Sequence, residues 1–417
     1  MSAIISSTCG RDGRAVYQSP TRELVSATRE WLEGEISLDD LRATEACLPQ
    51  RRNLALVVNN ECNLSCTHCF LQIPSLAGKR LAAAEWQRVL ESAMRENVEQ
   101  FLLVGKEVLL GRTGPEVVSM LGAIRSRRSS LRTGIITNGT LLHKHLDVVQ
   151  SASLNHMDIS MEGDATDHDA VRGAGAFAAL RSNVEWAVRL LGEQLFVTLT
   201  LQKRNIQRLD KALMAFAEMG IQSVGISPFE KLSYTDTSLA LSAADYRFFF
   251  DHLSHLEQLP LPHEMLVQID TCAFSPEMLV HFIESDWFDL DAMQMDGTGF
   301  MYASHRLDNG LTLSFRFLPW PLAVDFHTRI SADGAILCAA DGYLARAYHV
   351  NSLANIRDFD FDFGAAYRAA CMHPRLEHID SNFEAETTPR IRAAYRRHLQ
   401  ARHAGVLPAA LSLVPAS

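Results

Sequence analysis

The stretch LALVVNNECNLSCTHCF, residues 54–70, joins a short apolar run to three closely spaced cysteines. The run is rich in Leu and Val and ends in two asparagines, a pattern typical of a buried strand followed by a loop. Cys62, Cys66 and Cys69 therefore lie on a strand-to-helix loop, and no fourth cysteine follows nearby. If the strand belongs to a parallel sheet, the thiols lie at the edge where such sheets place their functional sites.

Similar apolar runs recur along the chain and are each followed by polar, Gly or Asn residues. Including the first, they occupy residues 54–60, 100–105, 132–139, 156–163, 195–202 and 222–229. Helical stretches such as AAAEWQRVLESAM (82–94) and PEVVSMLGAIRSR (115–127) lie between them. Such strand–helix units favour right-handed crossovers and a parallel sheet. We expect an α/β fold with a partial (β/α)6 TIM-like barrel. Periodicity alone also allows an open doubly wound sheet, although no G-x-G-x-x-G follows the first strand.

We divide the chain into a short N-terminal helical cap (1–50), the core barrel (51–235), a smaller α+β C-terminal extension (236–400) and a tail (401–417). Residues 20–47 predict one or two amphipathic helices, with apolar anchors at Leu24, Trp31, Leu38 and Leu41 and Ser37 as an N-cap. In the extension, residues 241–259 predict a helix, and residues 327–342 a hairpin that turns at Asp333-Gly334.

The overall composition is that of a soluble globular protein, with 417 residues of which 47% are hydrophobic and 21% charged. A net charge of -10 disfavours nucleic acid or an anionic membrane surface as a partner. No apolar run approaches the roughly 20 residues of a membrane span, and the N-terminus does not resemble a secretory signal. Of eight cysteines three are clustered and five scattered, which favours a reducing compartment. We expect a cytoplasmic protein.

Three thiolates restrict the metal sites that the cysteine loop can form. Structural zinc needs a fourth ligand; His68 is available in principle, but it directly precedes Cys69, and adjacent side chains rarely reach one ion. Iron–sulfur clusters also take thiolates, usually four. A four-iron cluster held by three cysteines leaves one iron open, which is useful for binding a substrate. The spacing favours an iron–sulfur site, with zinc as the alternative.

Cys-x3-Cys-x2-Cys after the first strand of six strand–helix units resembles the radical SAM superfamily. Further motifs of that family follow in order at GKEV (105–108), TNG (137–139), ISMEG (159–163) and HDAVRGAGAF (168–177), and the resemblance covers about residues 52–230. It implies a [4Fe-4S] cluster on Cys62, Cys66 and Cys69, with the open iron chelated by the amino and carboxylate groups of S-adenosyl-L-methionine. It also implies an electron donor such as flavodoxin or ferredoxin.

The same resemblance implies the residues that bind S-adenosylmethionine. Glu107 and the Gly105 carbonyl would receive the methionine ammonium, Ser160 and Arg172 its carboxylate, and His68 the adenine edge; Asn138 belongs to the third-strand motif of this cofactor site. The alternatives are that Glu107 is a solvated loop charge and Arg172 a surface salt-bridge partner.

The GKEV motif departs from the family's Gly-Gly-Glu-Pro-like turn in two places. Lys106 replaces the second glycine and Val108 the proline. Lys106 is compatible with a backbone contact to the cofactor if its φ is not positive. Because a cation beside an ammonium and a sulfonium is repelled, the Lys106 side chain points either away or toward an anionic substrate.

The C-terminal region resembles the SPASM or twitch extension of many radical SAM enzymes. Asp333-Gly334, Cys338 and Asn355-Ile356 match, but Arg316 and Phe317 stand before Pro319-Trp320 where a cysteine usually lies, and only Cys371 remains late in the chain. Two thiolates are too few for a cluster that normally takes three or four. We expect a degenerate extension without an auxiliary cluster, folded as a lid over the barrel mouth.

Cys272 is a candidate catalytic residue, because a thiol beside a substrate radical can donate a hydrogen atom, with Asp270 as a base. The alternative is a buried small hydrophobic residue.

The motifs together favour a radical SAM enzyme. Such an enzyme reductively cleaves S-adenosylmethionine to methionine and a 5′-deoxyadenosyl radical, which abstracts hydrogen from the substrate. Peptide maturases of this type commonly carry a leader-recognition domain and full auxiliary clusters, and we recognise neither here. That favours a small molecule in the biosynthesis of a specialised metabolite. The alternatives are a maturase of a ribosomally made peptide and a non-catalytic zinc-binding α/β protein.

Overall fold

The computed structural model describes residues 18–46, 52–69, 80–96, 98–229, 237–271, 276–295, 301–317, 327–337, 352–373 and 383–404. Cys272, Cys338 and Pro319-Trp320 lie outside these ranges.

A single mixed sheet of thirteen strands forms the centre of the described structure, in the order β13-β12-β11-β1-β2-β3-β4-β5-β6-β7-β10-β9-β8. The strands are β1 (Arg52–Val57), β2 (Val98–Val104), β3 (Arg132–Thr137), β4 (His156–Ser160), β5 (Leu195–Leu201), β6 (Ser223–Pro228), β7 (Met265–Asp270), β8 (Gln294–Met295), β9 (Met301–Arg306), β10 (Leu311–Phe317), β11 (His327–Ile330), β12 (Ala335–Leu337) and β13 (Ala354–Asn355). All neighbours from β11 through β10 pair in parallel. The predicted α/β fold with a partial parallel barrel is confirmed.

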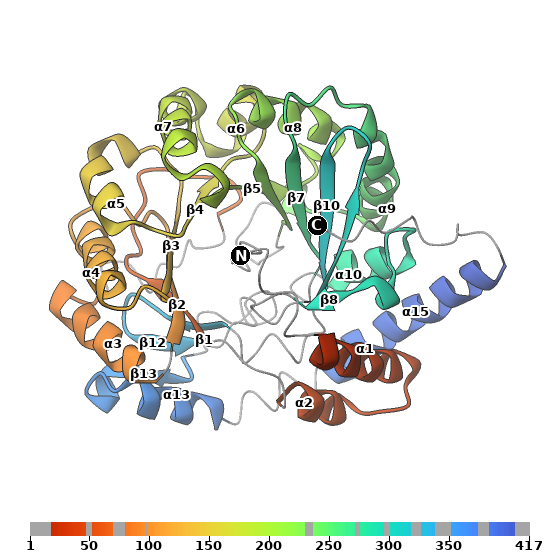
Figure 1. Ribbon diagram of the computed structural model, residues 1–417, viewed down its shortest axis with the longest axis horizontal. Helices are drawn as coiled ribbons and strands as arrows, with labels where there is room; N and C mark the ends of the chain where they lie inside the picture. The colour runs from red at the N-terminus through yellow and green to blue at the C-terminus, as the bar shows by residue number, and fades with distance from the viewer. Residues whose placement is uncertain are drawn as a thin grey trace.

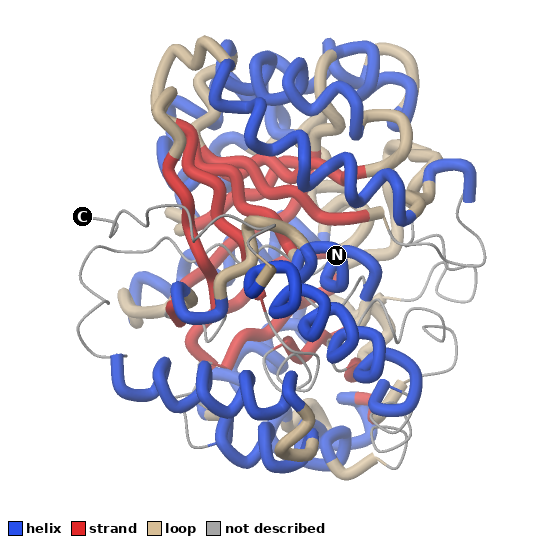
Figure 2. Tube along the Cα trace, turned by 90° about the vertical axis from the view of Figure 1, so that its right-hand side faces the viewer, coloured by secondary structure: helices blue, strands red, loops and turns tan. Residues whose placement is uncertain are grey.

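Helices follow the strands and lie outside the curved sheet, where α3 to α9 form an arc (Figure 1). The helices are α1 (Gln18–Glu33), α2 (Leu38–Ala46), α3 (Ala83–Arg95), α4 (Thr113–Arg127), α5 (Leu146–Ala152), α6 (Ala165–Arg172), α7 (Ala176–Leu191), α8 (Leu209–Glu218), α9 (Ala243–His252), α10 (Pro276–Glu284), α13 (Phe363–Cys371) and α15 (Thr388–His403). Figure 2 shows the strands as one curved layer with helices on its outside. The carboxyl ends of the parallel strands therefore converge at one end of the barrel.

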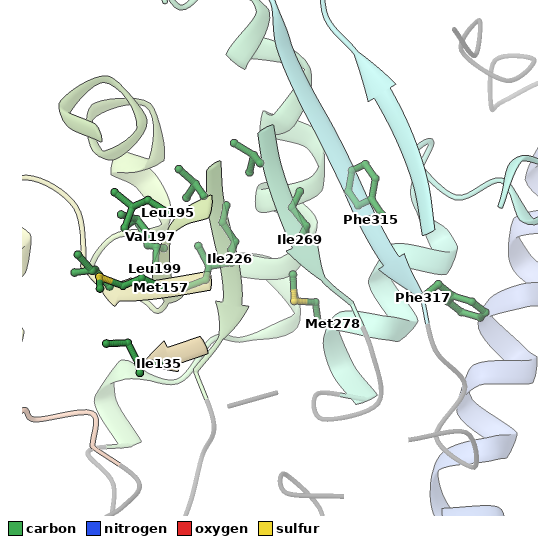
Figure 3. Close-up of a cluster of buried hydrophobic side chains, with 14 of the residues drawn as sticks. Ile135, Met157, Leu195, Val197, Leu199, Ile226, Ile269, Met278, Phe315 and Phe317 are labelled. Atoms are coloured by element: carbon green, nitrogen blue, oxygen red, sulfur yellow. The ribbon is translucent and has the colours of Figure 1, made fainter. Parts of the chain in front are cut away.

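Both faces of the central strands are buried. On β1, Leu54 and Leu56 belong to the large outer core, whereas Ala55 and Val57 belong to a small inner cluster with Leu102, Val104, Ile136 and Ala332. Figure 3 shows part of the outer core, to which β4, β5 and β6 contribute Met157, Val197 and Ile226. Burial on two faces explains why these strands read as near-continuous apolar runs in the sequence.

Strands from the region after residue 236 complete the same sheet. β7 continues the parallel order beside β6, β10 follows it, and β11 pairs in parallel with β1 on the other side. The predicted hairpin is present: β11 and β12 are antiparallel, with Ile330 opposite Ile336. Placing the domain boundary at residue 235 stays a prediction, although its two sides share one sheet.

The N-terminal helices α1 and α2 are held in place by their own cap and by contacts with α15. The predicted anchors Leu24, Trp31, Leu38 and Leu41 are buried. As predicted, Ser37 caps α2: its hydroxyl accepts from the Asp40 backbone N–H at 3.2 Å, and the Asp40 carboxylate accepts from the Ser37 N–H at 3.0 Å. Arg392 of α15 lies over the Trp31 ring, 5.8 Å from its centroid, and donates to the Trp31 carbonyl at 2.8 Å.

Helix α4 begins in direct contact with the turn that follows β2. A Cβ atom on Gly114, in the first turn of α4, would lie 1.7 Å from the Val108 carbonyl oxygen. We expect Gly114→Ala to lower the free energy of unfolding by about 3 kcal/mol, because backbone must move to admit the methyl group. Urea unfolding tests this, with the exposed Ser119→Ala on the same helix as a control that changes stability by less than about 0.5 kcal/mol. Equal stability of Gly114→Ala and the wild type would contradict the close contact.

Candidate functional site

The three cysteines lie on the loop that leaves the carboxyl end of β1, as the sequence predicts. Cys66 is buried, Cys62 and Cys69 are half-buried, and none forms a disulfide. N–H donors surround two of the sulfur atoms. The Leu64 backbone and the Asn138 side chain approach Cys62 Sγ at 3.4 and 3.6 Å, and Arg172 Nη1 approaches Cys66 Sγ at 4.0 Å. Such donors stabilise thiolate ligands and tune the potentials of iron–sulfur clusters.

The protonation state of the thiols matters because metals bind the thiolate form. Burial raises the pKa of the Cys62 thiol, and it raises the pKa of Cys66 to about 11 even though Arg172 opposes the change. Cluster binding must therefore release protons. Within the described ranges no group of three or more His, Cys, Asp or Glu side chains could hold a single metal ion. In an iron–sulfur cluster, by contrast, each cysteine binds a different iron.

Glu107 is completely buried in the turn after β2, so the alternative of a solvated loop charge is wrong. Its Oε1 accepts from the Leu109 backbone at 3.0 Å and the Thr137 hydroxyl at 2.7 Å, and its Oε2 accepts from the Asn138 backbone at 2.8 Å. Burial raises the pKa of this carboxyl, although these donors oppose the effect. Each carboxylate oxygen can accept about two hydrogen bonds. Among the described residues Oε2 accepts this one hydrogen bond, so by valence it can accept another.

The backbone of the GKEV turn fits the predicted role of its first two residues. Gly105 has φ +142° and lies so close to the cysteine loop that a Cβ atom would be 2.9 Å from the Asn59 carbonyl oxygen. Lys106 is not among the non-glycine residues with positive φ, which in the described chain are Ser153, Asp360 and Phe361. Lys106 thus meets the condition for a backbone contact with the cofactor, namely that its φ is not positive. A contact between its half-buried side chain and cofactor or substrate stays a prediction.

Asn138 joins the third-strand turn to the cysteine loop. Its side-chain nitrogen donates to Asn63 Oδ1 at 3.0 Å, and its oxygen accepts from the Thr140 backbone at 3.0 Å. Asn63 in turn donates to the Thr140 hydroxyl at 2.8 Å. Asn138 therefore holds the loop near Cys62, whatever cofactor contact it makes.

Arg172, His68 and a residue without a sequence-based role, Glu162, meet on the other side of the loop. Arg172 Nη2 lies 2.6 Å and His68 Nε2 3.4 Å from Glu162 Oε1, and Arg172 is only 8% exposed. The alternative of a surface salt bridge is therefore wrong for Arg172. Burial alone would raise the pKa of Glu162, but the charges of His68 and Arg172 and the arginine hydrogen bond outweigh it and lower that pKa. Ser160 ends β4 half-buried, in register with Thr198.

The only sequence signal for Glu162 is its position as the fourth residue of the ISMEG motif. That place puts an acid directly after a strand and ten positions before Arg172. Of the other predicted site residues, Cys272 lies outside the described ranges, so its role stays a prediction. Asp270 is buried at the end of β7, opposite Arg316 in the sheet register.

Another buried carboxyl, that of Asp158, lies two residues before Ser160 on the same face of β4. Asp158 is 2% exposed, and both of its oxygens accept from the Thr198 hydroxyl, at 2.7 and 2.6 Å. Burial raises its pKa to about 7, against the effects of Thr198 and the more distant Arg172. In the folded protein this group therefore keeps its proton up to nearly neutral pH.

We expect Asp158→Asn to change how stability depends on pH. Between about pH 4 and pH 7 folded Asp158 holds a proton that the unfolded chain has lost, so its stabilising contribution disappears as the pH rises through this window. The free energy of unfolding of Asp158→Asn minus that of the wild type should therefore rise over this window, by on the order of 4 kcal/mol. Urea unfolding at several pH values measures it. The opposite contribution of His156, whose pKa burial lowers to about 3, cancels in the difference. A difference that does not change with pH would contradict the prediction.

The residues of the site fit a cluster with S-adenosylmethionine. Three thiols, two of which are approached by N–H donors, lie near a buried carboxylate with a second acceptor position and near a buried guanidinium. These are the groups that a cluster and a zwitterionic ligand need.

The family comparison agrees with this site. Residues 56–216 match the family model described as the radical SAM superfamily, a segment that runs from β1 to α8 and includes all three cysteines of the loop. The chain therefore carries a radical SAM domain over these residues.

Two curated relatives illustrate the breadth of the family. The AdoMet-dependent heme synthase of Methanosarcina barkeri is 27% identical over 199 residues, which cover 47% of this chain and 55% of the synthase. A PqqA peptide cyclase of Xanthomonas campestris pv. campestris is 26% identical over 184 residues, 43% of this chain and 47% of the cyclase. The chain thus spans about half the length of these enzymes.

Solved structures share the fold beyond the radical SAM domain. SuiB of Streptococcus suis bound to its precursor peptide SuiA superposes with a TM-score of 0.54 at 14% identity, over 74% of this chain and 65% of SuiB. The enzyme anSMEcpe with bound AdoMet and the Kp18Cys peptide also gives 0.54, at 16% identity, over 79% of this chain and 83% of its own. At such identities the likeness shows the fold alone. In the described ranges, none of the helices has the length and apolar character that crossing a membrane requires.

Proposed function

We propose that this chain is a radical SAM enzyme that modifies a peptide. The observation that carries the chemistry is the three-cysteine loop at the barrel's carboxyl end, with N–H donors near two of its sulfurs and a buried carboxylate and a buried guanidinium beside it. When bound, a [4Fe-4S] cluster with S-adenosylmethionine supplies a 5′-deoxyadenosyl radical after one-electron reduction.

The chain's own part is to hold and orient these groups. Cys62, Cys66 and Cys69 would each bind one iron. Glu107 would accept the methionine ammonium at its open Oε2 position, and Ser160 and Arg172 would contact the methionine carboxylate. Because Glu107 and Arg172 are buried, these contacts would form away from water, where charge-assisted hydrogen bonds are strongest.

The comparisons support a peptide substrate over the small molecule that the sequence favours. The PqqA peptide cyclase is named for a peptide, and SuiB and anSMEcpe have been solved with peptides bound. The two structural neighbours also overlap most of this chain, including much of the region after residue 236. A small-molecule substrate remains the second candidate because of the similarity to the heme synthase and to a probable GTP 3′,8-cyclase.

A protease-sensitivity experiment separates the two substrate classes. Heat-stable, low-molecular-weight extract of the source organism is added to the anaerobically reconstituted protein with S-adenosylmethionine and dithionite. We expect the extract to increase 5′-deoxyadenosine formation, and pre-digestion with proteinase K to remove the increase. An increase that survives digestion would replace the peptide by a small molecule.

Iron content tests the prediction that the C-terminal extension holds no auxiliary cluster. With Cys371 alone among the late cysteines in the described ranges, at the exposed end of α13, we propose that the extension holds no second cluster. The reconstituted protein should then carry about four irons per chain. About eight would show a second four-iron cluster.

A further inference from the structure

Glu162 is the point where three separate segments meet the cysteine loop. It follows β4 and is completely buried. Its Oε1 accepts from Arg172 Nε at 3.0 Å and Nη2 at 2.6 Å, and it lies 3.4 Å from His68 Nε2. Its Oε2 lies 3.5 Å from the Gln202 amide, directly after β5. One carboxylate thus joins the loop, the end of α6 and the end of β5.

These contacts fix the orientation of Arg172. Because the guanidinium is planar, two nitrogens bound to one carboxylate oxygen determine where the third points. That third nitrogen, Nη1, lies 4.0 Å from Cys66 Sγ. The arginine therefore presents its charge to a predicted iron ligand while its other nitrogens are held by the protein.

The backbone next to Arg172 is hydrogen-bonded to the same loop. The Thr67 N–H donates to the Val171 carbonyl at 3.0 Å, so the last turn of α6 holds the loop between Cys66 and His68. Side-chain and backbone contacts from α6 and Glu162 thus converge on three consecutive residues, 66–68, the first of which is a cysteine.

We propose that Glu162 is a positioning residue, which holds Arg172 against Cys66 and anchors His68 so that the cysteine loop has its cluster-binding shape before the cluster binds. This rests on the proposed function, because it assumes that the cysteines hold a cluster. It gives Arg172 a second partner besides the methionine carboxylate that the family resemblance implies, namely the loop itself.

The first test uses the protein without iron. In Glu162→Gln the size is kept and the charge that holds Arg172 and His68 is lost; in Arg172→Gln the guanidinium is lost. We expect amide hydrogen exchange in residues 62–69 of the apo-protein to accelerate at least about tenfold in both variants, while β5 keeps its protection. Glu162→Asp keeps the charge with a shorter side chain and should fall between them and the wild type. If Glu162→Gln does not fold, the comparison of Glu162→Asp and Arg172→Lys with the wild type decides.

The second test measures the iron content and the midpoint potential of the reconstituted protein. Iron bound after anaerobic reconstitution should fall in Glu162→Gln and Arg172→Gln. The iron that does bind to Arg172→Gln should have a lower midpoint potential, because a positive charge and an N–H donor have left Cys66. A residue that only stabilised the fold would not shift the potential. Arg172→Lys keeps the positive charge but lacks the planar guanidinium. Its midpoint potential should therefore lie between those of Arg172→Gln and the wild type.

Arg208→Gln is the matched control, because Arg208 pairs with Asp164 and Asp167 at the start of the same helix, 2.7 Å from each carboxylate. It should leave loop exchange and iron content unchanged. The proposal is wrong if two results are found together. In Glu162→Gln and Arg172→Gln the amide hydrogen exchange of the loop and the iron content would both equal those of the wild type, and only the KM for S-adenosylmethionine would rise. Failure of the proposed function looks different, because the wild type itself would then form no 5′-deoxyadenosine.

Discussion

Cys66→Ala should lose the bound iron and lower 5′-deoxyadenosine formation by at least about 1,000-fold. Cys66 is the buried central cysteine of the loop; Arg172 Nη1 lies 4.0 Å from its sulfur, and the α6 backbone accepts a hydrogen bond from the next residue, Thr67. A cluster left with two thiolates has lost one of its three protein ligands, and two are fewer than the three or four that such a cluster normally takes. Iron analysis and product chromatography measure the two losses independently.

Cys371→Ser is the control for this result. Cys371 is exposed at the end of α13, a helix that lies beside β13 (Figure 1). It should keep both the iron content and the product of the wild type. Full iron content and product in Cys66→Ala would exclude the loop as the cluster site.

Glu107→Ala should lower the free energy of unfolding by about 4 kcal/mol as well as product formation. The substitution leaves the Leu109 and Asn138 backbone N–H groups and the Thr137 hydroxyl buried without their acceptor. Each such donor costs about 1–3 kcal/mol, and a cavity adds to the loss. Urea unfolding of the apo-protein measures the stability term without any cofactor.

The control for Glu107 is an exposed acid. Glu91→Ala on α3 removes one surface hydrogen bond, from Gln87 at 2.9 Å, and should change stability by less than about 0.5 kcal/mol. If Glu107→Ala were as stable as the wild type, the carboxylate could not be tying the turn after β2 to the end of β3. Glu107→Gln should retain part of the stability but bind S-adenosylmethionine more weakly, because it lacks the charge that an ammonium needs.

The sequence was sufficient for the parallel core and the cysteine loop because both depend on local patterns. Each of β1 to β6 is an apolar run with polar residues after it, and Cys62, Cys66 and Cys69 lie within eight positions. The positions of Glu107 and Arg172 followed from motifs at the strand ends. The resemblance implies partners for them in the cofactor, which stay predictions, but it says nothing of their partners in the protein.

What the sequence did not provide depends on contacts between distant segments. β11 pairs with β1 through residues such as His327 and Asn53, which no local pattern connects. Likewise, Glu162 has its role because the sheet brings the ends of β4 and β5 beside the loop after β1. β7 and β10 were missed as parallel strands because the β8–β9 segment between them interrupts the strand–helix alternation.

Formation of 5′-deoxyadenosine by the wild-type protein tests the radical SAM assignment most directly. The protein is reconstituted with iron and sulfide without air, and then given S-adenosylmethionine and dithionite. We expect about four irons per chain and formation of 5′-deoxyadenosine and methionine. About four irons with no 5′-deoxyadenosine, or a colourless protein with about one zinc per chain, would contradict it.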